Sequence, residues 1–250
     1  MAEAFIARAL KRFFIHVCEK DEARRRYLEQ TYKLISHDIS RLAQISEVLI
    51  LAVKPQDLPQ VLKELSPVLR KETLVISIAA GITSQFIEKN LGDKIRVIRT
   101  MPNMPALVGQ GITAVAPGKY AQTNDVDLAC KILSSLGKTV IVQEDMIDAI
   151  TAVSGSGPAY VFLFMECMVK AAESLGLKGN LASDLVKQTF FGSINLLIEK
   201  NMDPADLRGK VTSKGGTTEA AIKVFEKNSI DKIITDALRA AKRKAKLLSK

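Results

Sequence analysis

Short apolar runs alternate with amphipathic stretches over the first 148 residues of the chain. The apolar runs have the length of buried strands and fall at residues 13–18, 48–53, 73–78, 95–99, 112–115 and 139–142. Apolar residues recur at helical spacing between them, which predicts helices at 2–11, 22–32, 57–69, 84–91 and 125–136. This alternation predicts an α/β domain, with a mainly parallel sheet covered by helices on both faces.

The pattern changes after Asp148, where no further strand is predicted. Helical periodicity continues at 158–175, 181–200, 204–208, 218–227 and 230–249. The segment Ser154-Gly-Ser-Gly-Pro158 reads as a hinge, because Pro158 suits the first turn of a helix. We therefore predict two domains, residues 1–148 with the sheet and residues 149–250 as an all-helical domain.

Composition narrows the class of protein. Hydrophobic residues make up 47% of the chain, enough for a packed core, and no apolar run reaches the ~18–20 residues that span a bilayer. The start shows no secretory signal, and Cys18, Cys130 and Cys167 are odd in number and far apart. These features favour a cytoplasmic protein with free thiols and no membrane partner. His16 and Cys18 could share one strand face, but two candidate ligands do not make a metal site, so no metal is expected.

The formal net charge is +9, and much of it lies in the last twelve residues. Read at helical spacing, these cations form the solvated face of a terminal amphipathic helix. A nucleic-acid-binding protein would use such a tail, but aromatic residues are only 5% and no binding module is present. We expect no nucleic-acid partner, and the positive field would attract an anionic substrate or a dinucleotide.

A glycine turn that runs into a helix is the strongest chemical signal. Gly215 and Gly216 allow a tight bend, and Thr217 or Thr218 could cap the helix that follows. Free N–H groups at a helix start bind small anions such as carboxylates, and the hydroxyl of Ser213 adds a further donor. The alternative is a capped turn that binds no ligand.

Four motifs resemble those of pyrroline-5-carboxylate reductases, in the family's order and at about its spacing. They are Ala52-Val-Lys-Pro55, Arg99-Thr-Met-Pro-Asn-Met-Pro105, Val153-Ser-Gly-Ser-Gly-Pro-Ala-Tyr160 and the run from Pro204 to Ile222. The resemblance implies an enzyme that reduces 1-pyrroline-5-carboxylate to proline by hydride transfer from NADP or NAD in reduced form. It also implies a Rossmann-like first domain and a homodimer, or a larger homo-oligomer, that interlocks through the helical domain.

The resemblance also implies roles for residues of the glycine turn. The substrate carboxylate would lie on Ser213, Gly215, Gly216 and Thr217, with the N–H groups of Gly216 and Thr217 as donors. Thr218 would hydrogen-bond to the ring nitrogen and relay a proton. Lys214 stands where the family usually has Pro, which loosens the turn because Pro removes backbone freedom.

Three strand ends are expected to face the cofactor, because α/β sheets bind ligands at the carboxyl ends of their strands. The residues are Ala52, Val53, Lys54, Pro55, Ile78, Ala79, Ala80 and Asn103. The end of an earlier strand offers Glu19, which suits a ribose 2′-hydroxyl, and Lys20, which suits a 2′-phosphate. The choice between NAD and NADP therefore stays open.

The chain opens directly on the first helix of the dinucleotide-binding pattern. Met1-Ala-Glu-Ala matches the family's sequence just after the Gly-x-Gly-x-x-Gly turn, so the first strand and that phosphate loop are expected to be missing. A late start, a fragment and a degenerate paralogue would each explain this. The alternative function is a non-catalytic homologue that keeps the helical dimer but does not bind the cofactor.

Overall fold

The protein consists of two compact units in a computed structural model that describes residues 1–92 and 94–249. Unit 1 comprises Met1–Pro158 with Ala240–Lys250, and unit 2 comprises Ala159–Arg239. The division therefore falls ten residues later than the sequence pattern suggests, and the last turns of the terminal helix join unit 1. Each unit is described by itself below.

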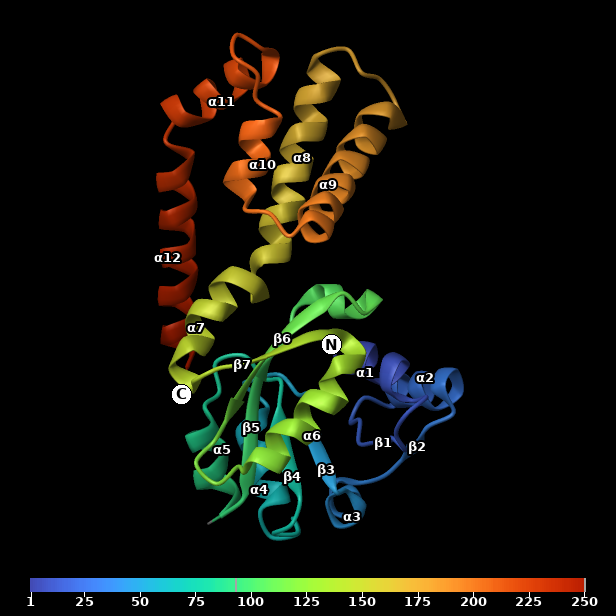
Figure 1. Cartoon of the computed structure of the whole chain (residues 1–250). Helices are drawn as coiled ribbons and strands as arrows, with labels where there is room; N and C mark the ends of the chain where they lie inside the picture. The colour runs from blue at the N-terminus through green and yellow to red at the C-terminus, as the bar shows by residue number, and fades with distance from the viewer. Residues whose placement is uncertain (93, 250) are drawn as a thin grey trace. The chain divides into compact units, whose positions relative to one another are not determined.

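Unit 1 is built on parallel strands, as predicted (Figure 1). The sheet order is β3-β4-β5-β6-β7, and only β5 and β6 run antiparallel within it. The strands are β1 (His16–Val17), β2 (Ile35–Ser36), β3 (Val48–Leu51), β4 (Leu74–Ser77), β5 (Arg96–Met101), β6 (Gly111–Pro117) and β7 (Gly137–Ile141). The sequence pattern missed β2, whose two residues are too few to show a period.

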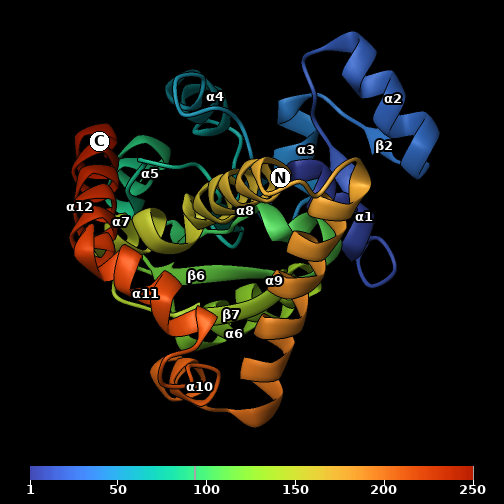
Figure 2. The ribbon, with the colours of Figure 1, turned by 90° about the horizontal axis from the view of Figure 1, so that it is seen from above.

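Helices cover both faces of this sheet, with α4 and α5 on one side and α6 on the other (Figures 1 and 2). The helices of this part are α1 (Ala2–Ala9), α2 (Glu22–Tyr32), α3 (Ile39–Ile45), α4 (Leu58–Leu65), α5 (Ser84–Leu91) and α6 (Thr123–Leu133). Short 3₁₀ turns follow at η1 (Met104–Val108), η2 (Ser134–Leu136) and η3 (Glu144–Met146).

Successive side chains along each strand point to opposite faces of the sheet. Leu49 and Leu51 of β3 lie in the cluster that contains α3, α4 and α5. Val48 and Ile50 pack instead against the cluster of α1 and α6. Both clusters hold fully buried Leu and Ile side chains, so the sheet is the centre of the core of unit 1.

β1 and β2 form a separate two-stranded parallel sheet. Within the described residues, β1 pairs only with β2, and β3 pairs only with β4. β1 and β3 therefore each leave one edge unpaired in the described chain, which agrees with the two edges expected beside a missing first strand. A small cluster of Ile6, Leu28 and Leu34 joins α1 and α2 to the β1–β2 pair.

The helix continues through the segment read as a hinge. α7 (Ile147–Ile150), the π-helix η4 (Thr151–Gly155) and α8 (Gly157–Ser174) follow one another within a continuous helical stretch from Glu144 to Ser174. Ser156 N donates to Thr151 O at 2.8 Å, five residues earlier in the chain. This π-helical hydrogen bond lets the helix continue although glycines lie in the segment.

This stretch also corrects the expectation that no segment is long and apolar enough to span a bilayer. One window of eighteen residues has a mean hydropathy of 1.3 and only 6% of it is buried. Such a helix is weak evidence for a membrane span, because length and composition alone select it.

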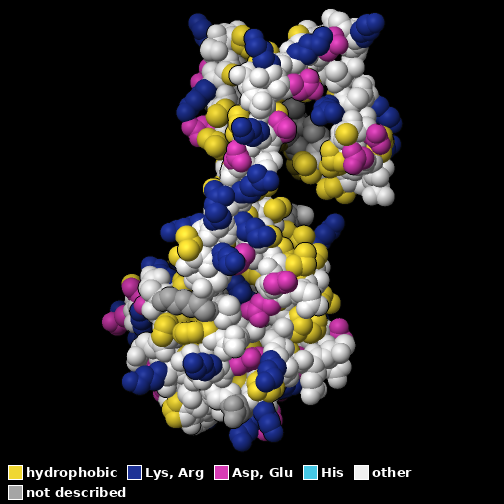
Figure 3. Space-filling model, turned by 90° about the vertical axis from the view of Figure 1, so that its left-hand side faces the viewer, with side chains coloured by type: hydrophobic (Ala, Val, Ile, Leu, Met, Phe, Trp, Pro, Cys, Tyr) yellow, Lys and Arg dark blue, Asp and Glu magenta, His cyan; other side chains and the backbone are white. Residues whose placement is uncertain are grey.

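Unit 2 is all-helical, as predicted. Besides α8 it holds α9 (Asn180–Lys200), α10 (Pro204–Lys210), α11 (Thr217–Lys227) and the first part of α12 (Ile230–Leu248). Ala182 and Val186 are its only buried hydrophobic residues. Hydrophobic side chains lie in patches among Lys and Arg on the face drawn in Figure 3. The helices of unit 2 thus leave large apolar areas uncovered.

Candidate active site

The cofactor segments predicted from sequence lie at one edge of the sheet. β3, β4 and β5 are parallel neighbours, and their register aligns Leu51 with Ser77 and Ser77 with Arg99. The segments Ala52–Pro55 and Ile78–Ala80, and then Asn103, follow the carboxyl ends of these three strands. They are therefore brought together where parallel sheets bind ligands.

Small side chains leave room at this edge. Ala52 and Ala80 are exposed, Ala79 is buried and Ile78 is half-buried. The backbone here is fixed, because Ile78 N donates to Leu51 O at 3.1 Å and Ala79 N donates to Ser77 Oγ at 3.3 Å. A rigid edge that carries three alanines leaves space for the ribose and ring of a dinucleotide.

Asn103 has a structural task as well as a candidate functional one. Its Oδ1 accepts a hydrogen bond from Ile112 N at 3.0 Å and so fixes the start of β6. No hydrogen bond from its Nδ2 is found within the described residues, so the amide retains a donor. The side-chain oxygen of Asn103 therefore serves the turn, and its amide nitrogen stays available for a ligand.

The end of β1 lies at the same edge as the end of β3. Lys20 Nζ is 3.6 Å from Asp57 Oδ2, and Asp57 is the residue before α4. Glu19 Oε1 accepts a hydrogen bond from Asp21 N at 3.0 Å. Lys20 thus reaches the residue that follows the Ala52–Pro55 segment by two positions, and Glu19 precedes Lys20 in the chain.

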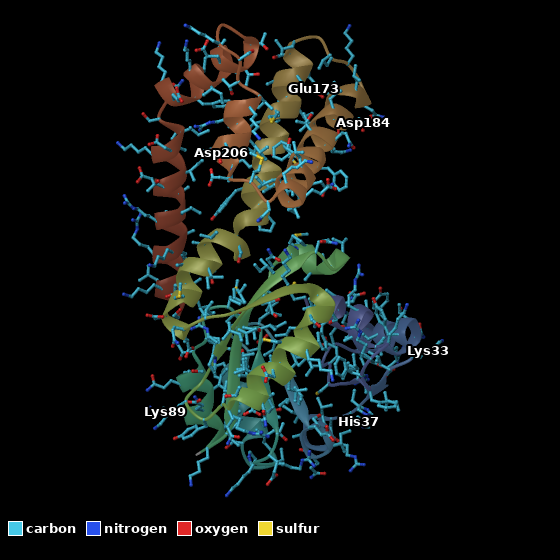
Figure 4. All side chains as sticks on the ribbon, in the orientation of Figure 1. Lys33, His37, Lys89, Glu173, Asp184 and Asp206 are labelled. Carbon is cyan, nitrogen blue, oxygen red and sulfur yellow. The ribbon has the colours of Figure 1, made fainter. Side chains whose placement is uncertain are left out.

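The two histidines form a pair next to this strand end. His16 Nδ1 and His37 Nε2 are 3.2 Å apart, and Figure 4 labels His37 after β2. Within residues 1–92 and 94–249 no group of three or more His, Cys, Asp or Glu side chains is placed to hold a metal ion.

Burial and neighbouring charge act on Cys18. The pKa of its thiol is raised, first by burial and then by the carboxylates of Asp38, Glu19 and Glu64. Arg25 acts in the opposite direction. The thiol is therefore held protonated, in an environment with more carboxylates than cations.

The glycine turn stands at the start of α11 in unit 2. Gly215 has φ of +75°, a conformation that strongly favours glycine. Gly216 N donates to Ser213 O at 3.0 Å, and Gly215 N donates to Glu219 Oε2 at 2.7 Å. An added Cβ on Gly216 would lie 2.5 Å from Ser213 Oγ, so a larger residue here would force the Ser213 hydroxyl to move.

Two expectations about this turn need correction. Gly216 is the N-cap of α11 and no side chain caps the helix, so neither threonine does so. The N–H of Gly216 is already engaged with Ser213 and is not a free donor. Within the described chain the N–H groups of Thr217 and Thr218 have no acceptor, because the first turn of a helix provides none.

Accessibility differs along the turn. Ser213, Gly215 and Thr217 are exposed, while Gly216 and Thr218 are half-buried. The hollow of about 360 Å³ between α10 and α11 is lined by Arg208, Thr212, Glu219 and Lys223 among others, and Thr218 is not part of its lining. Figure 4 labels Asp206 on α10 in this unit. The turn therefore presents its donors at the surface of unit 2.

Sequence reasoning missed two carboxylates that hold these segments in place. Glu219 holds the turn through Gly215 N and also pairs with Lys223 at 3.2 Å. Glu144 accepts from Ser84 N at 2.8 Å, from Ser84 Oγ, and from the buried Arg99 at 3.1 Å. The sequence could have pointed to such a carboxylate, because Arg99 lies within a predicted core strand and a buried cation needs a carboxylate partner.

Comparison with known proteins agrees with this arrangement. Residues 144–248 match the family model described as pyrroline-5-carboxylate reductase dimerisation. Residues 1–81 match one described as NADP oxidoreductase, coenzyme F420-dependent.

Relatives of known name align with most or all of the chain. A pyrroline-5-carboxylate reductase from Synechocystis is 43% identical over 256 residues, covering 100% of this chain and 95% of the relative. One from Pseudomonas aeruginosa is 42% identical over 201 residues, covering 80% of this chain and 74% of the relative.

Solved structures show the same fold. The Coxiella burnetii pyrroline-5-carboxylate reductase is 36% identical with a TM-score of 0.92, covering 100% of this chain and 95% of that one. The Plasmodium falciparum pyrroline carboxylate reductase, solved with NADP bound, is 28% identical with a TM-score of 0.86, covering 99% and 94%.

Proposed function

The chain belongs to the pyrroline-5-carboxylate reductase family, and from this premise we propose how its residues serve that reaction. The function is the reduction of 1-pyrroline-5-carboxylate to L-proline with NAD(P)H. The observation that carries it is 43% identity over the whole chain to a relative of that name. Nothing in the comparisons supports a non-catalytic homologue.

The edge formed by the strand ends in unit 1 would hold the cofactor. Ala52, Val53, Lys54 and Pro55 would face its adenosine half, and Ile78, Ala79, Ala80 and Asn103 its nicotinamide half. The bound nicotinamide supplies the hydride for the imine carbon. Asn103 would orient the carboxamide through Nδ2, because its Oδ1 is used by Ile112.

The glycine turn of unit 2 would hold the substrate. The hydroxyl of Ser213 and the N–H groups of Thr217 and Thr218 would bind the carboxylate, favoured by the positive end of the α11 dipole. Gly215 and Gly216 give the turn its shape. Thr218 Oγ1 would donate a hydrogen bond to the ring nitrogen and so orient the imine, and it would pass to that nitrogen a proton that the hydroxyl regains from water.

The protein is a homo-oligomer, as its match to the dimerisation model of the family shows. We propose a homodimer formed through unit 2, because α8 carries no buried residue yet is rich in apolar side chains. A second copy would cover these faces. The free cysteines suit a reducing cytoplasm, which is where we propose that the enzyme works.

The test is the consumption of NADH or NADPH in the presence of 1-pyrroline-5-carboxylate. Thr218→Ala should lower turnover about 10–100-fold, the scale of one lost hydrogen bond in the transition state. Thr218→Ser, which keeps the hydroxyl, should recover most of it.

The matched control is Thr123→Ala, an exposed threonine at the start of α6 in unit 1. It should leave turnover within twofold of the parent. Equal rates for Thr218→Ala and the parent would remove Thr218 from the mechanism.

A further inference from the structure

The residues at the end of β1 bear on which nucleotide the enzyme takes. This question rests on the proposed function, because it concerns the adenosine end of the same cofactor edge. The ion pair between Lys20 and Asp57 places the end of β1 beside the segment that follows β3. A ribose bound at the Ala52–Pro55 edge would therefore lie next to Glu19.

The cations around this strand end are mostly neutralised by carboxylates. Lys20 pairs with Asp57, Arg24 with Glu3, and Arg26 with Glu22. Arg25, half-buried, has no ion-pair partner within the described residues. A phosphate at this place would meet the cations of Arg25 and Lys54, unpaired in the described chain, and a larger number of carboxylates.

The thiol of Cys18 lies between β1 and Glu19 and responds to the local charge. After burial, three carboxylates raise its pKa, those of Asp38 at the α3 N-cap, Glu19 just after β1 and Glu64 of α4, and only Arg25 lowers it among the five largest influences. The potential beside the strand end is thus more negative than positive. A phosphomonoester with about −1.5 to −2 charges is disfavoured in such a field.

Glu19 has a free acceptor at this position. Its Oε1 accepts from Asp21 N at 3.0 Å, which orients the carboxylate, and no partner of Oε2 is found in the described part of the chain. Asp21 caps α2 by accepting from Arg24 N at 2.7 Å, so the turn that carries Glu19 is anchored. An oriented carboxylate accepts well from a ribose diol.

We infer that Glu19 selects a nucleotide with a free ribose 2′-hydroxyl, so that this enzyme prefers NADH to NADPH. The carboxylate accepts from the hydroxyl and repels a 2′-phosphate at the same place. The relative from Plasmodium falciparum was solved with NADP, so the fold itself admits the phosphate. The preference comes from the charges around β1 in this chain.

Binding of each nucleotide to the full chain, followed by nucleotide fluorescence without substrate, tests the inference. NADH should bind about tenfold tighter than NADPH or more. Glu19→Gln, which keeps the size of the side chain, should reduce that ratio at least threefold, mainly by tightening NADPH. The control is Glu72→Gln, an exposed carboxylate just before the amino end of β4, which should leave the ratio unchanged.

The outcomes separate the two proposals. Equal or tighter binding of NADPH by the parent, or an unchanged ratio in Glu19→Gln, would overturn the role of Glu19 while turnover with NADPH would still support the enzyme. Failure of both nucleotides to bind would overturn the proposed function, and the inference with it. Competition between 5′-AMP and adenosine 2′,5′-bisphosphate gives a second readout of the adenosine end alone.

Discussion

Removal of the Glu144 carboxylate should destabilise unit 1 more than any surface change. This side chain joins three parts of the unit. It accepts from the first residue of α5, Ser84, through both N–H and Oγ, and from Arg99 of β5 at 3.1 Å. Arg99 also lies 4.0 Å from Asp148, whose Oδ1 accepts from Ser249 near the end of α12. One carboxylate thus anchors the group that connects the sheet to the last helix.

The magnitude follows from what Glu144→Ala leaves behind. Breaking a buried ion pair by removing one partner costs about 3–5 kcal/mol, because the other charge stays buried. The Arg99 side chain is 5% exposed, but Glu144 is 26% exposed, which reduces the cost. Asp148 also still faces Arg99, whereas the start of α5 loses its acceptor, worth about 1 kcal/mol. We expect a loss of about 3 kcal/mol in the free energy of unfolding.

Thermal and chemical unfolding would measure this loss. For a chain of this size about 3 kcal/mol corresponds to a fall in Tm of roughly 6–12 °C. Glu144→Gln should cost less, because its amide oxygen can still accept from Ser84 while only the charge is lost. Glu22→Ala removes an exposed pair and should cost less than about 0.5 kcal/mol. If Glu144→Ala melts with the surface control, the buried network does not stabilise the unit and the reasoning is wrong.

Two further predictions concern the turn and the acid limit of stability. Gly216→Ala should lower kcat/KM about tenfold or more, because the new Cβ would lie 2.5 Å from Ser213 Oγ, whereas Gly209→Ala, with open space around its Cβ, should stay within about twofold. Steady-state kinetics decide this, and equal losses in both variants would contradict it. Hydrogen bonds from Arg24 and two tyrosine hydroxyls hold the pKa of Glu3 below its ordinary value of 4.5. Its contribution is complete above that pH and is lost as the pH falls through the lowered folded-state pKa, so Glu3→Gln should flatten the acid side of a stability–pH curve.

The fold was predictable because its signals are local. Runs such as 48–53 and 73–78 alternate between two covered faces, and helical spacing persists over many residues in α8 and α9. Two-residue strands such as β2 give no period to detect, and the antiparallel pairing of β5 with β6 depends on contacts far apart in sequence. The glycines at 155 and 157 suggest a break in the helix. In the structure the helix instead continues through this region as the π-helical segment Thr151–Gly155.

The candidate site was predictable in its segments but not in its hydrogen bonds. Glycines and strand ends mark the right places, since turns and carboxyl edges have strong residue preferences. Which donor remains free depends on partners that no spacing reveals. Gly216 N donates to Ser213 O, and Gly215 N donates to Glu219 Oε2. Ile112 N donates to Asn103 Oδ1.

The thin interior of unit 2 has a thermodynamic consequence. With Ala182 and Val186 as its only buried hydrophobic residues, this unit lacks the apolar burial that would offset its chain entropy. In the proposed homodimer, assembly would supply the remainder, so mass action would govern how firmly these helices hold together. Dilution alone should loosen them while the sheet keeps its shape, and the melting point of α8 to α11 should rise with protein concentration.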